Sequence, residues 1–237
     1  MPDRPTLVLL PGALQASASL TPLASALAPF ADVLLLDLPG HGGQIIPDVL
    51  RSWEIAAAVV TELDRRNVAR AHVFGYSLGG YVGLLLARAH PERVAGVFAH
   101  ATKLAWTPEV AAREVRGLNP DRILEKAPAF AATLQQAHTP QDWQLLTRRV
   151  ADLLTELGEN PAVTDSVLRA LKVPVQLSLG DQDRMVSLEE TVAAYRALAR
   201  GRLLVLPGVT HPFEHAVQER LAPEIHAFLQ AAEEVHA

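Results

Sequence analysis

Three residues that lie far apart in the chain, Ser77, Asp183 and His211, are of the types that together activate a hydroxyl group for attack. A serine hydroxyl is a weak nucleophile at neutral pH, so it needs a base within hydrogen-bond reach. An imidazole can take the proton and later return it to a leaving group. A carboxylate behind the imidazole fixes its tautomer and stabilises the imidazolium. Together these residue types predict nucleophilic chemistry at an acyl carbon.

The serine lies at the centre of the sequence Gly75-Tyr76-Ser77-Leu78-Gly79, which has the G-x-S-x-G pattern. An apolar run before it predicts a strand, and the run after it predicts a helix. In such a sharp turn the serine is strained, and a side chain at either flanking glycine would collide with the crossing chain. The helix N-terminus behind the serine favours developing negative charge. Because the pattern also occurs by chance, a catalytic interpretation requires an acid and a base later in the chain.

An acid and a base come after Ser77 in the order that this type of sheet requires, which is serine, acid, histidine. The apolar run 173–179 predicts a buried strand and leads into the loop that contains Asp183. The run 202–206 predicts the last strand, and His211 follows it. Because such folds place their sites at the carboxyl ends of parallel strands, we expect the three side chains to lie together there.

Two neighbours compete for the roles of acid and base. Asp181 directly follows a glycine, which is typical of a residue that caps a turn, so Asp183 is the preferred acid. For the base, His211 is preferred because it directly follows the turn after the last predicted strand, whereas His215 lies four residues further on. The same four residues have spacings that a metal cluster could use. We expect no metal, because H-E-x-x-H is absent and Pro212 lies between the histidines.

The remaining histidines suit other roles. His41 lies in a glycine-rich loop, which we expect it to hold by a hydrogen bond. His100 ends a predicted strand and is a candidate pocket residue, but it precedes every candidate acid. His72 lies inside a predicted strand, where a packed side chain is the simpler interpretation. The others lie at a helix end, in the middle of the chain or in the final helix or tail: His90, His138, His226 and His236.

The elements that must position these residues alternate along the chain. Short, nearly continuous apolar runs predict buried strands, and the segments between them have helical periodicity. Strands of this kind indicate a parallel sheet that helices cover on both faces. The predicted strands are 6–10, 32–37, 71–75, 94–99, 173–179 and 202–206. The sequence thus predicts an α/β fold with about six mostly parallel strands.

Two of the predicted helices carry start signals. Apolar residues recur every fourth position after Ser52, which is a candidate N-cap. Residues 187–190 read Ser-Leu-Glu-Glu, the pattern of a capping box. We expect the buried face of this second helix at Val192, Tyr195 and Leu198.

The stretch 103–160 breaks the alternation, because it has no strand-like run. Thr107 and Thr139 each precede a proline and predict an N-cap followed by a first-turn proline. We expect three or four short helices here that form a lid over the site and are too small for a separate core. The core domain then comprises 1–102 and 161–237. The alternative is a solvated excursion with no role in substrate binding.

On these landmarks the chain resembles an α/β-hydrolase-fold protein of the serine hydrolase branch with a helical cap. The resemblance extends over nearly the whole chain. It rests on residues 9–13 (LLPGA), 37–42 (DLPGHG), the pattern around Ser77, and the loops 180–183 and 208–211. The fold that it implies agrees with the alternation described above.

The resemblance also implies roles for particular residues. It assigns the triad to Ser77, Asp183 and His211. It assigns the oxyanion hole to two backbone N–H groups, those of Ala13 and Leu78, with Leu14 as the neighbouring alternative to Ala13. Donors of this kind each contribute on the order of 3 kcal/mol to the transition state.

The chain departs from the family pattern at two places. Pro11 stands where the family's loop commonly has a histidine, which is usually structural. The predicted strand 6–10 begins almost at once, so the antiparallel pair that often opens this fold is expected to be missing.

The implied reaction is hydrolysis of an ester or closely related acyl bond through an acyl-enzyme, as in carboxylesterases, with no cofactor. A serine at position 77 argues against haloalkane dehalogenase and epoxide hydrolase chemistry, which this fold performs with a carboxylate nucleophile. The same triad also serves carbon–carbon bond hydrolases, lyases and cofactor-free perhydrolases. A small-molecule-binding protein without turnover is a further alternative, because fold does not fix function.

Candidate substrate-binding residues lie near the predicted strand ends and in the predicted lid. Lys103 is a candidate for reading a substrate carboxylate, with a solvated surface lysine as the alternative. The full set is Leu14, Tyr76, Lys103, Trp106, Met185 and Phe213.

Composition narrows the class of protein. The 237 residues are 49% apolar, which suffices for one large core with an inserted lid. The net charge of -5 offers no basic surface for nucleic acid, and no apolar run is long enough to span a bilayer. The chain has no cysteine, and because its first residues lead directly into a predicted core strand, we expect no signal peptide. We therefore expect a cytoplasmic protein that acts on a small acyl substrate, with a homodimer left open.

Overall fold

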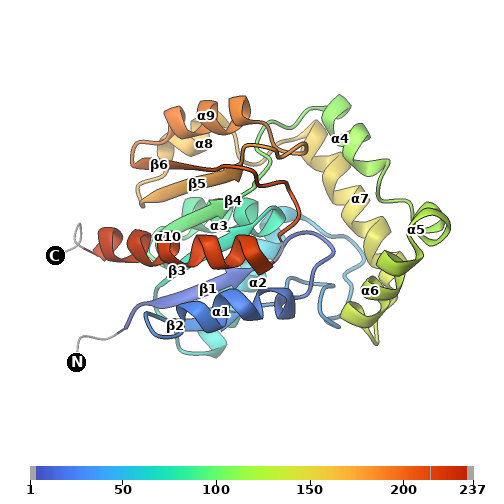
Figure 1. The fold of residues 1–237 in the computed structure, drawn as a ribbon, viewed down its shortest axis with the longest axis horizontal. Coiled ribbons are helices and arrows are strands. Elements are labelled where there is room, and N and C mark those ends of the chain that lie inside the picture. The colour runs from blue at the N-terminus through green and yellow to red at the C-terminus, as the bar shows by residue number, and fades with distance from the viewer. Residues whose placement is uncertain (1–3, 214, 234–237) are drawn as a thin grey trace.

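The computed structural model describes residues 4–213 and 215–233, and within them six strands form one sheet (Figure 1). The strand order is β2-β1-β3-β4-β5-β6, and every neighbouring pair is parallel. The strands are β1 (Thr6–Leu10), β2 (Asp32–Leu35), β3 (Ala71–Tyr76), β4 (Val94–His100), β5 (Val175–Gly180) and β6 (Gly201–Leu206). The predicted parallel sheet is confirmed.

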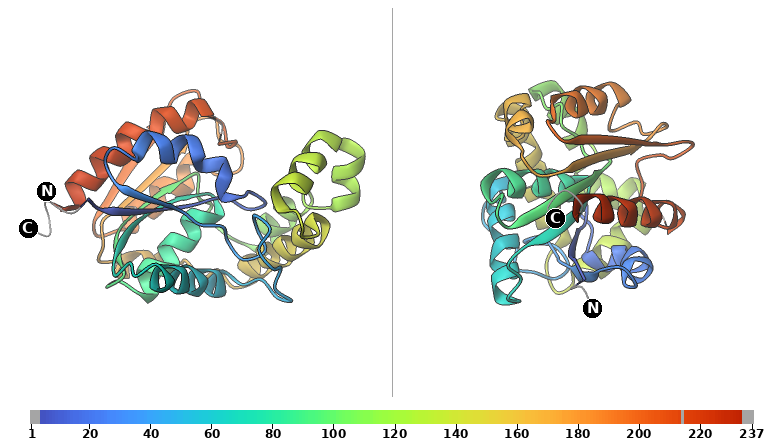
Figure 2. Two further views of the ribbon diagram at one scale, coloured as in Figure 1. Left: turned by 90° about the horizontal axis from the view of Figure 1, so that it is seen from below. Right: turned by 90° about the vertical axis from the view of Figure 1, so that its left-hand side faces the viewer.

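Helices cover both faces of the sheet (Figure 2). A 3-10 turn η1 (Ser17–Leu20), α1 (Thr21–Leu27) and α10 (His215–Glu233) pack on one face. The other face carries α2 (Ser52–Arg65), α3 (Leu78–Ala89), α8 (Asp165–Ala170) and α9 (Leu188–Ala197). None of the helices in the described part of the chain is long and apolar enough to cross a membrane.

Successive residues of a central strand supply the two cores in turn. Val73 packs with the α2 and α3 side, whereas Phe74 packs with the α1 and α10 side. Val97 and Phe98 of β4 divide in the same way. Both faces of these strands are apolar because helices cover both, which is why the strands are continuous apolar runs in the sequence.

Strand ends differ from the predicted bounds by one or two residues. β5 begins at Val175 rather than at residue 173, because Pro174 has no N–H group to donate to a neighbouring strand. β2 ends at Leu35 rather than at residue 37, where the chain turns into the loop that precedes α2. These shifts leave the order and direction of the strands unchanged.

The predicted helix start signals are confirmed in part. The capping box at Ser187 is confirmed, and so is the N-cap at Thr107, whose hydroxyl accepts the N–H group of Val110. The N-cap at Ser52 is wrong, because Arg51 holds that position and Ser52 is already helical. The N-cap at Thr139 is also wrong: this residue follows the last residue of a helix, and its hydroxyl donates back to the Gln135 carbonyl at 2.7 Å.

The segment between β4 and β5 adds helices at the carboxyl ends of the strands (Figures 1 and 2). These are α4 (Pro108–Val115), α5 (Pro120–Lys126), α6 (Pro128–His138) and α7 (Trp143–Glu159). We call them the helical insertion. Asp142 caps α7 by accepting the N–H group of Gln144 at 2.8 Å. At 17 residues, α7 is longer than the short helices predicted, and its buried face includes Leu146, Val150, Leu153 and Leu157.

Candidate active site

Ser77 lies in a strained turn between β3 and α3. Its backbone has φ 51° and ψ −114°, a conformation that costs a residue with a side chain on the order of 1–3 kcal/mol. A Cβ atom on Gly75 would overlap the backbone of Gly79 and Gly80, and one on Gly79 would overlap the backbone of Leu10. The Ser77 N–H group donates to the His100 carbonyl at 2.8 Å, which ties the turn to β4. Here the G-x-S-x-G pattern has the sterics of a nucleophile elbow.

Asp183 and His211 form a hydrogen-bonded pair beside this turn. His211 Nδ1 lies 2.8 Å from Asp183 Oδ2, and the carboxylate is fully buried. A carboxylate only accepts, so the ring proton lies on Nδ1 and the lone pair of Nε2 is available. Oδ1 of Asp183 accepts the N–H groups of Met185 and Val186 at 2.8 and 2.9 Å. Burial raises the pKa of Asp183, but the hydrogen bonds from His211 and these two N–H groups outweigh it and hold the pKa below its ordinary value.

The two loops that carry this pair are bound to each other. Asp181 is exposed and accepts the Gly208 N–H group at 2.6 Å, so its carboxylate fastens the histidine loop and does not contact the imidazole. The Gln182 N–H group donates to the Val209 carbonyl at 3.0 Å. Of the two candidate acids, the structure therefore brings Asp183 to His211. The side chain of His215, the competing base, lies outside the described part of the structure.

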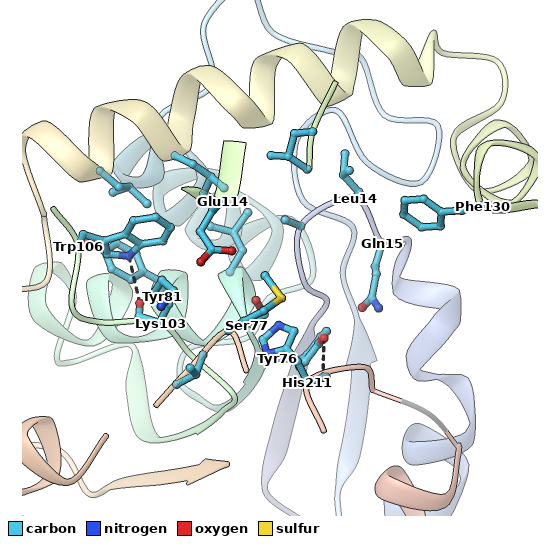
Figure 3. Close-up of a pocket in the computed structure, with 17 residues that line it drawn as sticks. Leu14, Gln15, Tyr76, Ser77, Tyr81, Lys103, Trp106, Glu114, Phe130 and His211 are labelled. Atoms are coloured by element: carbon cyan, nitrogen blue, oxygen red, sulfur yellow. Dashed lines mark hydrogen bonds between the residues drawn. The ribbon is translucent and has the colours of Figure 1, made fainter. Parts of the chain in front are cut away.

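Tyr76 fixes the backbone of the histidine loop. Its hydroxyl donates to the His211 carbonyl at 3.0 Å (Figure 3). Burial raises the pKa of Tyr76, and the charge of Asp183 raises it further, so the phenol stays a donor. Phe213 stacks on the Tyr76 ring with centroids 4.9 Å apart.

His100 lies behind the pair and is buried. Its Nδ1 lies 2.9 Å from the Ser178 hydroxyl, and its Nε2 has no hydrogen-bond partner among the described residues. Burial, with a smaller contribution from neighbouring His211, lowers the pKa of His100 to about 3. The imidazole is therefore neutral at physiological pH.

Two backbone N–H groups near Ser77 have no partner within the described chain, those of Ala13 and Leu78. Both residues line the same cavity as Ser77. The alternative donor, Leu14, is occupied, because its N–H group donates to His41 Nε2 at 3.1 Å. The resemblance leaves Ala13 and Leu14 as alternative donors, and the contact with His41 favours Ala13.

A cavity of about 280 Å³ lies between the strand ends and the helical insertion (Figure 3). Ser77 and His211 both line it, although the serine hydroxyl makes no hydrogen bond to a described residue. Five of the six predicted substrate-binding residues also line it: Leu14, Tyr76, Lys103, Trp106 and Met185. Phe213 is the exception. It packs in the core behind Tyr76, where it is 8% exposed.

Lys103 lines the cavity, but it is not a solvated surface residue. It is 9% exposed, and its Nζ lies 3.5 Å from Oε2 of Glu190. Oε1 of Glu190 accepts the N–H group of Leu104 at 3.1 Å, so this carboxylate anchors the start of the insertion to α9. The solvated surface lysine is therefore wrong, whereas the contact of Lys103 with a substrate carboxylate stays a prediction, against which the pairing with Glu190 argues.

Sequence reasoning missed the walls that the insertion contributes. Glu114 of α4 points its carboxylate into the cavity toward Ser77 (Figure 3). Arg113 contacts one oxygen of this carboxylate, Oε1, at 3.0 Å. The spacing of leucines three and four residues apart along α7 is a signal that could have indicated an apolar face. No comparable signal in the sequence indicates Glu114. The residues missed are Gln15, Tyr81, Glu114, Leu118, Phe130, Leu154, Leu157 and Val186.

The donor set suits acyl chemistry better than metal binding. Within residues 4–213 and 215–233, no group of three His, Asp or Glu side chains is placed to share an ion. A hydroxyl, an imidazole oriented by a carboxylate, and two unpartnered N–H groups share one cavity. These are the parts needed to attack a carbonyl carbon and to hold the oxyanion that forms.

Comparison with known proteins places the chain among enzymes of one fold. A family model described as the alpha/beta hydrolase fold matches residues 5–213. A pimeloyl-(acyl-carrier protein) methyl ester esterase of Methylococcus capsulatus is 32% identical over 231 residues, which cover 84% of this chain and 85% of that protein. The enzyme of the same name from Neisseria meningitidis is 29% identical over 206 residues, which cover 76% of each chain.

Solved structures agree with the family model. A thermophilic esterase from Thermogutta terrifontis has a TM-score of 0.77 at 21% identity, with 97% of this chain and 91% of that chain covered. At that identity the likeness shows the fold alone.

Proposed function

Since this chain belongs to the α/β-hydrolase fold family, we propose that it is a serine hydrolase that cleaves a carboxylic ester of a small molecule. The observation that carries the proposal is the hydrogen bond from His211 to buried Asp183, in the cavity that Ser77 lines. An imidazole oriented in this way has its Nε2 lone pair available to deprotonate a hydroxyl. The strained turn presents Ser77 to that cavity.

In the first half of the reaction, Ser77 Oγ attacks the ester carbon and its proton passes to Nε2 of His211. The contact between these two groups is expected to tighten when substrate fills the cavity, as it does in many hydrolases. The tetrahedral intermediate collapses, the bond to the alkoxy oxygen breaks, and His211 protonates the departing alcohol. Asp183 stabilises the imidazolium while it exists. The product of this half is an acyl-enzyme on Ser77.

In the second half, His211 takes a proton from water, and the hydroxide attacks the acyl carbon. The bond from Ser77 to that carbon breaks, the serine recovers its proton from His211, and the acid leaves. In both halves the N–H groups of Ala13 and Leu78 stabilise the oxyanion. No cofactor takes part in these steps.

The cavity indicates the kind of acyl group. Its walls are mainly apolar side chains, which suit a hydrocarbon chain. Glu114 adds one carboxylate, which disfavours a substrate with its own negative charge near the ester. We propose an uncharged ester, in keeping with the methyl esters that the names of the relatives specify. The segment 103–160, which contains the helical insertion, is proposed to act as the lid that closes this cavity.

A chain-length series of p-nitrophenyl esters, run with wild type and Ser77→Ala, tests the proposal. We expect wild-type turnover of short and medium acyl chains and loss of at least about 1,000-fold in the variant. Tight ester binding with negligible turnover in both proteins would instead indicate a binding protein. Turnover that survives the substitution would place the chemistry elsewhere.

A further inference from the structure

The turn that carries the proposed oxyanion donor Ala13 is itself strained. The Gln15 N–H group donates to the Gly12 carbonyl at 3.2 Å, which closes a four-residue turn with Ala13 and Leu14 at its centre. Leu14 has φ 59°, in the left-handed region. Glycine or asparagine is favoured at this third position of a turn, because a leucine side chain is strained there. A leucine at this position needs contacts that hold its two peptide groups.

One imidazole holds the peptide group before Leu14. The Leu14 N–H group donates to His41 Nε2 at 3.1 Å, and the other ring nitrogen of His41 lies 3.0 Å from the Pro39 carbonyl. An N–H group can only donate and a carbonyl can only accept, so His41 is neutral with its proton on Nδ1. The bond to the Pro39 carbonyl agrees with the prediction that His41 holds its own glycine-rich loop, and the bond from Leu14 ties a second loop to it.

A second imidazole, from the helical insertion, holds the peptide group after Leu14. His138 ends α6, is fully buried, and places its Nε2 3.1 Å from the Leu14 carbonyl. Its Nδ1 accepts the Gly42 N–H group at 3.1 Å. These partners fix the opposite tautomer, with the proton on Nε2. The two rings meet edge to face with centroids 5.7 Å apart, so the two imidazoles that bind Leu14 also contact each other.

We infer that His138 is a positioning residue of the active site: through the Leu14 carbonyl, the helical insertion holds the oxyanion turn in its strained form. Ala13 and Leu14 are the two central residues of one turn, so a rotation of the Leu14 peptide groups re-aims the Ala13 N–H group. A preorganised donor loses much of its effect when it moves by about half an ångström. The insertion thereby supports the catalytic groups as well as covering the cavity. This inference rests on the proposed function for the role of Ala13.

Three substitutions separate the two hydrogen bonds of His138. In His138→Gln, the amide nitrogen takes the place of Nε2 and keeps the donor to the Leu14 carbonyl. In His138→Asn, the amide oxygen takes the place of Nδ1 and keeps only the acceptor for Gly42. His138→Leu keeps neither. Thr147→Val is the matched control, because it removes another buried hydrogen bond of the insertion, from Thr147 Oγ1 to the Trp143 carbonyl at 2.8 Å.

Steady-state kinetics on a p-nitrophenyl ester give the first readout. We expect kcat to fall by about 10- to 100-fold in the Leu and Asn variants with KM changed by less than about threefold, because the loss is in the transition state. His138→Gln and Thr147→Val keep kcat within about fivefold of wild type. Equal losses in the Gln and Asn variants, or an unchanged kcat in His138→Asn, would overturn the inference.

Hydrogen exchange gives a readout that does not depend on hydrolysis. In wild type and His138→Gln, the amides of Leu14 and Gln15 are expected to be protected, and in His138→Asn they exchange at least about tenfold faster. Thr147→Val leaves this peptide unchanged. If wild type hydrolyses no ester, the proposed function fails. Equal protection of these amides in the Asn and Gln variants would separately show that His138 does not hold the turn.

Discussion

Asp183 lies 2.8 Å from Nδ1 of His211 through one carboxylate oxygen, while its other oxygen accepts two N–H groups of its own loop. The two N–H groups of its own loop thus fix the position of the carboxylate that orients the imidazole. Asp181, two residues earlier, is turned to Gly208 instead. Two carboxylates in one loop therefore have different contacts, one with His211 and one with the loop that carries His211.

This division predicts different effects of two matched substitutions. Asp183→Asn is expected to lower kcat/KM by about 100- to 10,000-fold, because an amide favours the wrong tautomer of His211. Asp181→Asn keeps an acceptor for Gly208 and is expected to stay within about tenfold of wild type. Steady-state hydrolysis of one p-nitrophenyl ester by both variants makes the comparison. The reverse ranking would reassign the acid to Asp181.

The strain at Ser77 predicts a trade of stability against activity. Ser77→Ala removes the hydroxyl but keeps the Cβ atom and therefore the backbone strain. Ser77→Gly removes the hydroxyl and also relieves the strain. We expect the free energy of unfolding of the Gly variant to be about 1 kcal/mol larger than that of the Ala variant. This is the net difference, which already includes the cost of the larger entropy of glycine in the unfolded chain. Urea titration of the two inactive variants measures the difference. A Gly variant no more stable than the Ala variant would mean that the turn stores no strain.

Glu114 predicts charge selectivity. Its carboxylate lies in the wall of the cavity, so Glu114→Gln is expected to raise the kcat/KM ratio of an anionic to a neutral ester by about 3- to 10-fold. The mono-p-nitrophenyl ester of glutaric acid and p-nitrophenyl butyrate form a suitable pair. Glu109→Gln, on the exposed side of the same helix, serves as the control. An unchanged ratio in Glu114→Gln would show that this carboxylate does not sense the acyl chain.

Buried histidines predict a loss of stability in mild acid. Burial lowers the pKa of His41 to about 4 and that of His100 to about 3, from 6.5. Between pH 6.5 and about 4 the unfolded chain binds protons at both positions and the folded chain does not, so the free energy of unfolding falls as the pH falls. Each site contributes a slope of up to about 1.4 kcal/mol per pH unit.

Urea titrations at several pH values test this expectation. The His100→Gln variant has no titrating group at this position. Between pH 6 and 4, the slope of its free energy of unfolding against pH should therefore be smaller than that of wild type, by up to the contribution of one proton. Above pH 7, where the unfolded histidines are neutral, the two proteins should show parallel pH dependence. Identical slopes in acid would contradict the assignment of His100 as neutral in the folded protein.

Much of the fold was predictable from the sequence. Each central strand is apolar on both faces, and the turns between elements contain the glycine, proline and aspartate residues that turns favour. The strands that carry Asp183 and His211 were found in this way, and turn chemistry favoured Asp183 over Asp181. The choice between Ala13 and Leu14 as donors was not decidable, since it depends on His41, 27 residues further along the chain. Which histidine would reach a loop across the molecule cannot be read from local spacing.

The insertion was the least predictable part. Its helical content followed from the absence of strand-like runs and from the Thr-Pro pairs, but the end of α6 at His138 and the packing of α7 depend on contacts with the core. Thr139 illustrates this, because its sequence suits a helix start while its hydroxyl completes the preceding helix. Phe213 likewise looked like a pocket residue by its distance from His211, whereas its ring completes the core beneath Tyr76.

The most direct test of the proposed chemistry is covalent labelling of the protein with a fluorophosphonate, followed by mass spectrometry of its peptides. We expect one adduct per chain, on the peptide that contains Ser77, with labelling slowed at least about 100-fold in His211→Ala and absent in Ser77→Ala. Labelling at any other residue, or a folded wild type that takes up no label, would contradict the proposal that Ser77 is an activated nucleophile.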